Sequence, residues 1–382
     1  MCSYKATTSK VVDAKMIDRA KMMISLQRGS LTRKNLSKRY NTIISAPYEK
    51  RSYCSSCRML ILDLERDTTH RDHDTFDHVT NYLLRNPSRL LMPLTNKSGE
   101  SQYWFSDAAI EFLCSIPTTS LPFDAVLCVG APRIYEHLRS TRKVTKLKSF
   151  LLDYDYRFAG FWTVSQYAQY NMFTHYFYDA GEQKAYRRFL ARSQNLFVFV
   201  DPPFGGLVHA LSQSMNKIKL DFYKARGKDS RAICKFMWVY PYFMEHRIKT
   251  ASGLAMSDYK VDYINHPLYR AGKATKQSPI RLFTDIPLLE LKLPQPGYRF
   301  CKECQKFVSL ENRHCRQCND CTSKDGQTYK HCTLCRRCTK PSYAHCRKCK
   351  RCHITDAQCN ASNIRKCSIC SSTDHLRQNC TS

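Results

Sequence analysis

The chain has 382 residues and a formal net charge of +29, from 61 Lys and Arg against 32 Asp and Glu. That length accommodates two or three domains with a buried core, and that charge favours a polyanionic partner, nucleic acid before a membrane surface. The sequence contains neither a stretch of 18 apolar residues nor a segment like a signal peptide. We therefore expect an intracellular protein that does not associate with membranes.

Residues 1–50 are basic and poor in glycine, with 11 Lys and Arg against three Asp and Glu. We predict one or two short helices here. Their basic face would serve either as an RNA contact or as an ordinary charged surface.

The next segment, residues 51–84, has the ligand types of a zinc finger. Two cysteines three positions apart precede two histidines three positions apart. We predict a site formed by Cys54, Cys57, His70 and His73, with His78 as a spare fourth ligand. The alternative is a set of unpaired surface residues.

Residues 85–293 alternate short apolar strands with mixed helical segments, which predicts an α/β fold with a largely parallel sheet covered on both faces. We predict strands at Ala125–Val129, Phe150–Leu152, Leu196–Val200 and Met237–Tyr240, and further ones near Tyr259–Tyr263 and Arg281–Phe283.

Two strand ends in this domain could hold a cofactor. Gly130 follows the first strand in a tight turn, where Rossmann-like methyltransferases meet their cofactor. The second strand ends in carboxylates that could accept the ribose hydroxyls. Asp155 is our first candidate for this role and Asp153 the second.

The most informative motif follows the strand Leu196–Val200. Asp201, Pro202, Pro203 and Phe204 form it, and Gly205 and Gly206 come next. Two prolines must end the strand because neither can donate to a sheet ladder. We therefore predict a stiff loop at the carboxyl end of a strand, where open α/β sheets bind ligands.

This loop suits chemistry on an exocyclic amine. The Asp201 carboxylate and a proline carbonyl could hold both hydrogens of adenine N6, and Phe204 could stack on the base. Placement and electrostatics would then carry the catalysis. The tetrapeptide resembles the signature of amino-group methyltransferases that use S-adenosylmethionine. The first predicted strand ends at Gly130, the second in carboxylates and a later one in the Asp201 motif, and this order along the chain indicates S-adenosylmethionine as the cofactor.

Residues 265–279 mix aromatic, glycine and basic residues, which suits either a mobile lid against RNA or an exposed basic loop. Gln102–Phe105 and Asn171–Phe173 are aromatic or polar clusters. Taken as chemistry alone, they fit the core or a strand edge.

Fifteen of the 21 cysteines follow residue 300, interleaved with histidines, and in a reducing compartment that indicates zinc. Within residues 298–360 we predict four interleaved sites. They comprise Cys301, Cys304, His314 and Cys321; Cys315, Cys318, His331 and Cys338; Cys332, Cys335, His345 and Cys352; and Cys346, Cys349, His353 and Cys359. The pattern resembles the cysteine-rich domain of DHHC palmitoyltransferases. The membrane helices and the Asp-His-His-Cys nucleophile of those enzymes are missing, so we expect a structural role.

Residues 364–382 contain a zinc knuckle with CCHC spacing, formed by Cys367, Cys370, His375 and Cys380. Such knuckles bind single-stranded RNA. With the finger and the array this makes about six zinc sites.

These motifs together resemble the zinc-finger CCHC-domain protein 4 family, which methylates one adenosine of large-subunit ribosomal RNA at N6. The resemblance extends from about residue 50 to 380 and includes Leu152–Asp155, Asp201–Gly206 and Tyr259–Tyr263. It implies a Rossmann-like class I methyltransferase domain. It also implies that Gln102, Tyr103, Trp104, Phe105, Arg133, Asp155, Asn171 and Met172 line the cofactor pocket. The family's N-terminal GRF-type zinc ribbon is not among the motifs, which leaves room for a different RNA affinity or target choice.

We therefore expect an S-adenosylmethionine-dependent, zinc-containing rRNA methyltransferase. It would be a monomer in the nucleus or nucleolus, and in part in the cytoplasm, and its zinc modules would bind an RNA stem-loop. Three alternatives stay open: an RNA-binding protein with an inactive methyltransferase domain, an enzyme acting on glutamine or cytosine amines, and a DNA adenine methyltransferase.

Overall fold

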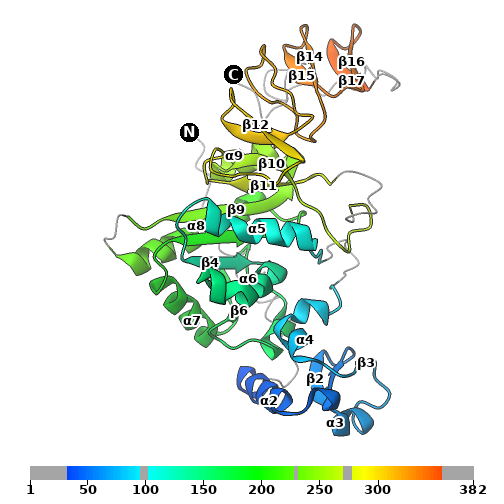
Figure 1. Cartoon of the computed structure of the whole chain (residues 1–382), viewed down its shortest axis with the longest axis vertical. Helices are drawn as coiled ribbons and strands as arrows, with labels where there is room; N and C mark the ends of the chain where they lie inside the picture. The colour runs from blue at the N-terminus through cyan, green and yellow to red at the C-terminus, as the bar shows by residue number, and fades with distance from the viewer. Residues whose placement is uncertain (1–31, 95–101, 228–230, 270–277, 355–382) are drawn as a thin grey trace, which may run out of the picture. The chain divides into compact units, whose positions relative to one another are not determined.

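The computed structural model describes residues 32–94, 102–227, 231–269 and 278–354 (Figure 1). The chain divides into two compact units, Met1–Leu291 and Lys292–Ser382. The division falls close to residue 293, where we predict the α/β domain to end. None of the helices in the described ranges combines the length and apolar composition needed to cross a membrane.

The first unit is built on an eight-stranded sheet in the order β10-β11-β9-β8-β4-β5-β6-β7. Neighbours from β9 to β6 run parallel, whereas β10, β11 and β7 pair antiparallel to their neighbours. The strands are β4 (Ala125–Val129), β5 (Lys148–Asp153), β6 (Tyr167–Asn171), β7 (Tyr176–Phe177), β8 (Leu196–Val200), β9 (Cys234–Pro241), β10 (Ala255–Lys260) and β11 (Ile280–Thr284). The parallel part reads third, second, first, fourth and fifth strand, the arrangement of doubly wound sheets.

Helices cover both faces of this sheet, which confirms the predicted α/β class. Alternate residues of β4 face opposite sides because successive side chains of a strand point in opposite directions. Leu127 packs with Leu190 and Ile218, while Cys128 lies beside Cys114. The covering helices are α5 (Asp107–Thr119) and α6 (Pro132–Thr145) on one face, and α7 (Ala180–Ala191), α8 (Val208–Arg226) and α9 (Glu245–Ser252) on the other.

A smaller module precedes the sheet in the chain. Its elements are α2 (Arg33–Ser45), η1 (Tyr48–Lys50), β1 (Arg51–Cys54), β2 (Met59–Leu62), α3 (Asp63–Asp67), β3 (Thr75–Phe76), α4 (Asn81–Arg85) and η2 (Pro87–Arg89). The basic face predicted for α2 is partly wrong, because two of its arginines turn towards the protein. Arg33 donates to the carbonyls of Ala159 and Trp162 at 2.6 and 2.7 Å, beside η3 (Tyr156–Gly160). Arg39 forms an ion pair with Glu65 at 2.6 Å.

The second unit consists of short antiparallel hairpins, each formed by two strands. These are β12 (Tyr298–Cys301) with β13 (Lys306–Ser309), β14 (Lys330–Cys332) with β15 (Arg337–Thr339), and β16 (Tyr343–Cys346) with β17 (Arg351–Ile354). Its only buried apolar cluster among the described residues comprises Cys301, Val308 and Cys321, with Cys304 packed against it. Such a small core cannot supply the stability of the unit without further cross-links.

The predicted strands Ala125–Val129 and Leu196–Val200 match β4 and β8 residue for residue. The prediction near Tyr259–Tyr263 is wrong at its carboxyl end, because β10 ends at Lys260. Tyr263 instead forms an isolated antiparallel bridge with Phe105. Strand β6 had no counterpart among the predicted strands.

Candidate active site and zinc clusters

The candidate active site lies where the carboxyl ends of β4 and β8 meet. These two strands are neighbours in the sheet, and the chain leaves β4 and β8 towards opposite edges, which makes this the crevice where doubly wound sheets bind ligands. The amide of Asp201 donates to the Val129 carbonyl at 2.9 Å, and the amide of Gly130 donates to the Leu152 carbonyl at 2.8 Å. Three strand ends are thus held in one row.

Gly130 is required by its surroundings. Its φ of +69° lies in the left-handed region, which L side chains rarely adopt. A Cβ at this position would lie 2.6 Å from the Asp201 carbonyl oxygen and 2.7 Å from Met172 Cε. The glycine therefore lets the ends of β4, β6 and β8 approach one another closely.

Asp201 presents a carboxylate that no described residue satisfies. Although the residue keeps some exposure, its carboxyl has no hydrogen-bond donor in the described part of the chain. Burial raises its pKa well above the ordinary value, and the nearby charge of Asp153 adds to this effect. A carboxyl in this state gains most from a ligand that brings N–H or O–H donors.

Asp153, the last residue of β5, and Asp155 are both buried but differ in their hydrogen-bond partners. Both oxygens of Asp155 accept hydrogen bonds from Arg157, at 2.7 to 3.1 Å, and Gln102 Nε2 donates to the same carboxylate at 3.2 Å. Asp153 accepts only backbone amides, that of Asp155 at 2.9 Å and that of Tyr154. Asp155 is engaged by its ion pair, whereas Asp153 lies close enough to Asp201 to raise the pKa of the Asp201 carboxyl. The choice between them as the ribose acceptor stays a prediction.

Asp153 is also the more unusual acid. Burial raises its pKa to about 7, and repulsion by the Asp155 carboxylate contributes. An acid with this pKa is about half ionised near neutral pH, and hydrogen-bond donors favour its ionised form. A ribose diol supplies such donors.

The segment Gln102–Phe105 is held against the residues that follow β10. The amide of Trp104 donates to Asn265 Oδ1 at 2.7 Å, and Asn265 Nδ2 donates to the Gln102 carbonyl at 2.8 Å. The Tyr103 ring lies 4.4 Å from the ring of His266. The described start of the predicted lid, residues 265–269, therefore folds onto this segment; residues 270–277 lie outside the described ranges.

Arg133 contacts the same segment from the other side. Its guanidinium donates to the Phe105 carbonyl at 2.5 Å and to Asp107 Oδ1 at 2.7 Å. Arg133 therefore positions Phe105, which packs edge-on against Phe199 of β8 at 6.0 Å. Because both terminal nitrogens of the Arg133 guanidinium already have protein partners, Arg133 positions other residues of the predicted pocket.

Asn171 and Met172 end β6 beside this crevice. Asn171 Oδ1 accepts a hydrogen bond from the amide of Phe173 at 2.9 Å, which shapes the turn. Met172 is buried against Gly130. The polar sequence of this strand hid it from pattern analysis, although the family resemblance had already singled out both residues.

The loop that begins with Asp201 is braced internally. The amide of Gly206 donates to the Pro203 carbonyl at 2.9 Å. A Cβ on Gly206 would overlap the Phe173 ring. The Phe204 ring is half-buried and lies 6.0 Å from the ring of Tyr240.

Sequence reasoning missed three side chains in this region: Tyr240, Tyr263 and Asn265. Tyr263 is fully buried, stacks on Phe105 at 5.4 Å and lies near Asp201, whose charge raises its pKa further. A buried aromatic residue gives no local signal of function. Tyr263 and Asn265 are brought to the site only by the pairing of segments more than 150 residues apart, whereas Tyr240 comes from the strand next to β8.

The cysteine and histidine side chains gather in the sets that the sequence predicts. Within each set all ligand atoms lie within 4.8 Å of one another. The sets are Cys54, Cys57, His70 and His73; Cys301, Cys304, His314 and Cys321; Cys315, Cys318, His331 and Cys338; Cys332, Cys335, His345 and Cys352; and Cys346, Cys349 and His353. Cys359 and the knuckle cysteines 367, 370 and 380 lie outside the described residues, as does His375.

The ligand spacings fit a tetrahedral metal. Zinc bonds of about 2.0–2.3 Å place neighbouring ligands about 3.3–3.8 Å apart. Cys57 Sγ lies 3.3 Å from His73 Nδ1, and Cys304 Sγ lies 3.2 Å from His314 Nδ1. Cys318 Sγ and Cys338 Sγ are 3.8 Å apart. These clusters could therefore hold zinc without rearrangement.

The first two cysteines of each of the five described clusters share one backbone feature. The residue after the second cysteine has a left-handed conformation, with φ between 49° and 57°, at Arg58, Gln305, Asn319, Arg336 and Lys350. None of these is glycine, so the tight turn that exposes two cysteine sulfurs to one point must compensate the strain. The finger module thus repeats the geometry of the array, which pattern spacing alone did not reveal.

Comparisons with known proteins agree with this site. A family model described as probable N6-adenine methyltransferase matches residues 96–271. The chain is 40% identical over 294 residues to the human rRNA N(6)-adenosine-methyltransferase ZCCHC4, covering 74% of this chain and 57% of that protein. It is 38% identical over 293 residues to the protein of the same name from Xenopus laevis, covering 74% and 59%.

The chain thus spans less than two thirds of the length of these curated relatives. The matched region nevertheless contains the whole Asp201 crevice. With this sheet, this loop and this level of identity, the chain resembles the ZCCHC4 proteins over about three quarters of its own length.

Proposed function

We propose that this protein transfers a methyl group from S-adenosylmethionine to N6 of an adenosine in large-subunit ribosomal RNA. The observation that carries the proposal is the approach of Gly130 to Asp201, with an unsatisfied carboxylate at the switch point of the sheet. The names of the ZCCHC4 relatives support the substrate class. The predicted nuclear or nucleolar location and monomeric state belong to the same proposal.

The crevice fits the cofactor. Bound S-adenosylmethionine would supply a sulfonium methyl group, which is electrophilic without activation by an acid. Asp153 would accept the ribose hydroxyls, Gly130 would admit the cofactor close to the backbone, and Met172 would pack beside it. Segment 102–105 would cover the opposite side, held there by Asn265 and Arg133.

Asp201 and the proline loop would hold the adenine amine. Pro203 already accepts the Gly206 amide, which leaves the Pro202 carbonyl as the second acceptor for N6 hydrogens. Fixing both hydrogens would orient the nitrogen lone pair towards the methyl group. As the N–C bond forms and the S–C bond breaks, N6 must lose a proton. The raised pKa of Asp201 makes its carboxylate a suitable acceptor once ionised.

Zinc would hold the cysteine modules in shape for RNA binding. The five described clusters and the knuckle would give about six ions. The array and the knuckle would grip a stem-loop, and one exposed adenosine would be flipped into the crevice. An already unstacked base would be preferred, because flipping it costs less.

The test is methyl transfer from labelled S-adenosylmethionine to ribosomal RNA that lacks the modification, followed by digestion to nucleosides. We expect label in N6-methyladenosine. We expect Asp201→Ala to lower kcat by about a hundredfold or more without unfolding the protein.

Label in another nucleoside or in protein would redirect the proposal to a different amine. Cofactor binding without transfer to any RNA would leave an inactive domain with RNA-binding modules. Near-normal turnover by Asp201→Ala would remove Asp201 from the reaction.

A further inference from the structure

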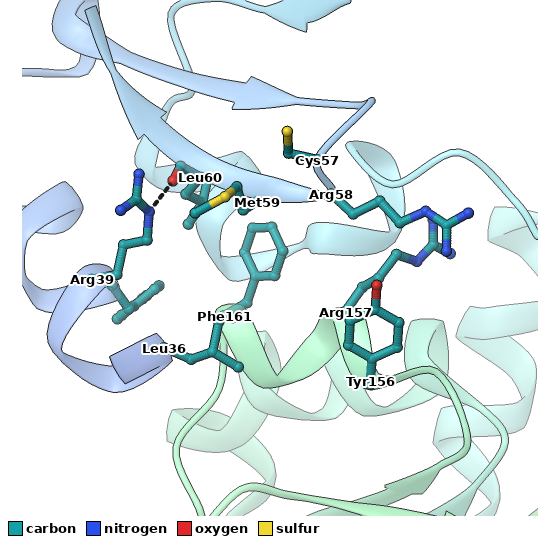
Figure 2. Close-up of a pocket in the computed structure, with 11 residues that line it drawn as sticks. Leu36, Arg39, Cys57, Arg58, Met59, Leu60, Tyr156, Arg157 and Phe161 are labelled. Atoms are coloured by element: carbon teal, nitrogen blue, oxygen red, sulfur yellow. Dashed lines mark hydrogen bonds between the residues drawn. The ribbon is translucent and has the colours of Figure 1, made fainter. Parts of the chain in front are cut away.

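A second concave site lies on the first unit, away from Asp201. Figure 2 shows it between α2, the turn from β1 to β2, and η3. It encloses about 570 Å³, part of it open to solvent. Its lining includes none of Gly130, Asp153 or Asp201. We name it the finger pocket, because Cys57 of the first zinc cluster lies at its wall.

The floor of the finger pocket is apolar and partly aromatic. In Figure 2 the Phe161 ring stands in its centre, with Met59 above it and Leu36 below. Phe161 itself is buried, whereas Leu36, Met59 and Tyr156 keep partial exposure. A planar ligand could therefore slide over Met59 and contact the edge of Tyr156.

The rim is cationic, but its three arginines are not equivalent. Arg39 is engaged by the Leu60 carbonyl at 2.5 Å and by Glu65, and Arg157 is engaged by Asp155. In the described part of the chain, the guanidinium of the exposed Arg58 has no hydrogen-bond or ion-pair partner. Arg58 has a left-handed backbone conformation, with φ of 57°, which fixes the direction in which the chain continues after Cys57.

We propose that the finger pocket binds an unstacked base of the RNA substrate, with Arg58 paired to the neighbouring phosphate. An aromatic and apolar floor beside a free guanidinium is the combination by which proteins hold single-stranded bases. No acidic side chain lines the pocket, and the whole chain carries a net charge of +29. A sulfonium cofactor would be repelled by Arg58, which separates this site from the methyl-donor crevice.

This inference rests on the proposed RNA substrate and adds a second point of contact. Arg157 connects the pocket to the crevice, because it lines the pocket and also donates to Gln102 and forms an ion pair with Asp155. A base held here would fix the RNA relative to the crevice without entering it. It would act on binding and on target choice, and leave the chemistry to Asp201.

The experiment uses the full, zinc-loaded chain and a fragment of large-subunit ribosomal RNA that lacks the modification, on which methyl transfer is measured in parallel. RNA affinity, its salt dependence, S-adenosylmethionine affinity and zinc content are measured for Arg58→Glu, Tyr156→Ala and a control, Lys143→Glu. Lys143 is an exposed cation on α6 that does not line the pocket, so its variant makes the same charge change elsewhere.

We expect Arg58→Glu to weaken RNA binding about tenfold and to reduce the salt slope by about one phosphate contact. We expect Tyr156→Ala to weaken binding about fivefold with the salt slope unchanged. Cofactor affinity and zinc content should stay at wild-type values. RNA substituted with 4-thiouridine should cross-link to the peptide that contains residues 156–161.

RNA affinities equal to that of Lys143→Glu for both pocket variants, with no cross-link at residues 156–161, would overturn the proposal. If Arg58→Glu loses zinc, Tyr156→Ala and the cross-link decide, because Tyr156 lies outside the finger. A wild-type protein that cross-links at the pocket but transfers no methyl group would refute the proposed activity while supporting the pocket.

Discussion

The hydroxyl of Tyr240, on β9, lies 3.0 Å from the carbonyl oxygen of Gly206, in the loop that follows β8. The same hydroxyl lies 3.5 Å from the Pro203 carbonyl. Tyr240 is fully buried, and its ring packs against Phe204. One side chain of the next strand thus ties both ends of the proline loop to the sheet.

Tyr240→Phe should therefore loosen the loop and keep the fold. Losing one such hydrogen bond costs about 0.5–1.5 kcal/mol, so we expect kcat to fall about threefold to tenfold. The dissociation constant of S-adenosylmethionine should not change, because the Tyr240 hydroxyl donates to loop carbonyls and the substitution keeps the ring. Single-turnover methyl transfer and cofactor titration check this.

The matched control is Tyr186→Phe. Tyr186 is also buried, but its hydroxyl hydrogen-bonds Asp221 of α8 at 3.3 Å. If both variants slow transfer equally, a general loss of packing rather than the loop bond is responsible.

Arg33 anchors α2 to the sheet domain, and its loss should destabilise the protein strongly. Its guanidinium forms an ion pair with Glu182 at 3.1 Å and donates to two carbonyls near η3. Glu182 is fully buried. Arg33→Ala would leave this carboxylate without its cation, which costs about 3–5 kcal/mol for a buried pair.

Denaturant unfolding measures this loss, with Lys34→Ala, at an exposed position on the same helix, as control. The double variant Arg33→Ala, Glu182→Gln should recover part of the stability, because no charge is then left buried. An unchanged midpoint for Arg33→Ala would show that α2 does not contribute to the stability of the sheet.

The sequence predicted those features of the fold and of the candidate site that depend on neighbouring residues, and missed those that depend on contacts between distant segments. Strands β4 and β8 could be found because each is five consecutive buried apolar residues. The acidic end of β5 was also found, but not the Asp155–Arg157 ion pair that distinguishes its two carboxylates. Tyr240 carries no signal at all, since its role depends on a loop 34 residues away in the chain.

Binding of S-adenosylmethionine should depend on pH through Asp153. Burial raises the pKa of Asp153 to about 7, and the ribose hydroxyls need the ionised carboxylate as acceptor. Affinity should therefore fall as the pH drops below 7, approaching tenfold per pH unit, and level off above 8.

Calorimetric titration between pH 6 and 8.5 tests this dependence. Asp153→Asn should bind the cofactor weakly at every pH and lose the slope. A flat profile for the wild type would show that Asp153 stays ionised in the free protein or does not contact the cofactor. In Asp155→Asn the slope should persist, because Asp155 is paired with Arg157.

Metal removal should affect the two units of the chain differently. The sheet domain has a large apolar core that needs no metal, whereas the buried cluster of the second unit consists of Val308 and cysteines. A strong chelator should therefore abolish RNA binding by the second unit while S-adenosylmethionine binding persists. Fluorescence titration of each ligand before and after chelation gives both values.

Single cysteine substitutions can show which cluster binds each zinc ion. Native mass spectrometry should show one zinc fewer for Cys335→Ser, because Cys335 lies in one complete cluster with Cys332, His345 and Cys352. Cys114→Ser should lose none, since Cys114 is buried against α6 and its sulfur lies 3.8 Å from the Ile134 carbonyl. Full zinc content and full RNA affinity in Cys335→Ser would contradict the assignment of this cluster, because a serine hydroxyl binds zinc far more weakly than a thiolate.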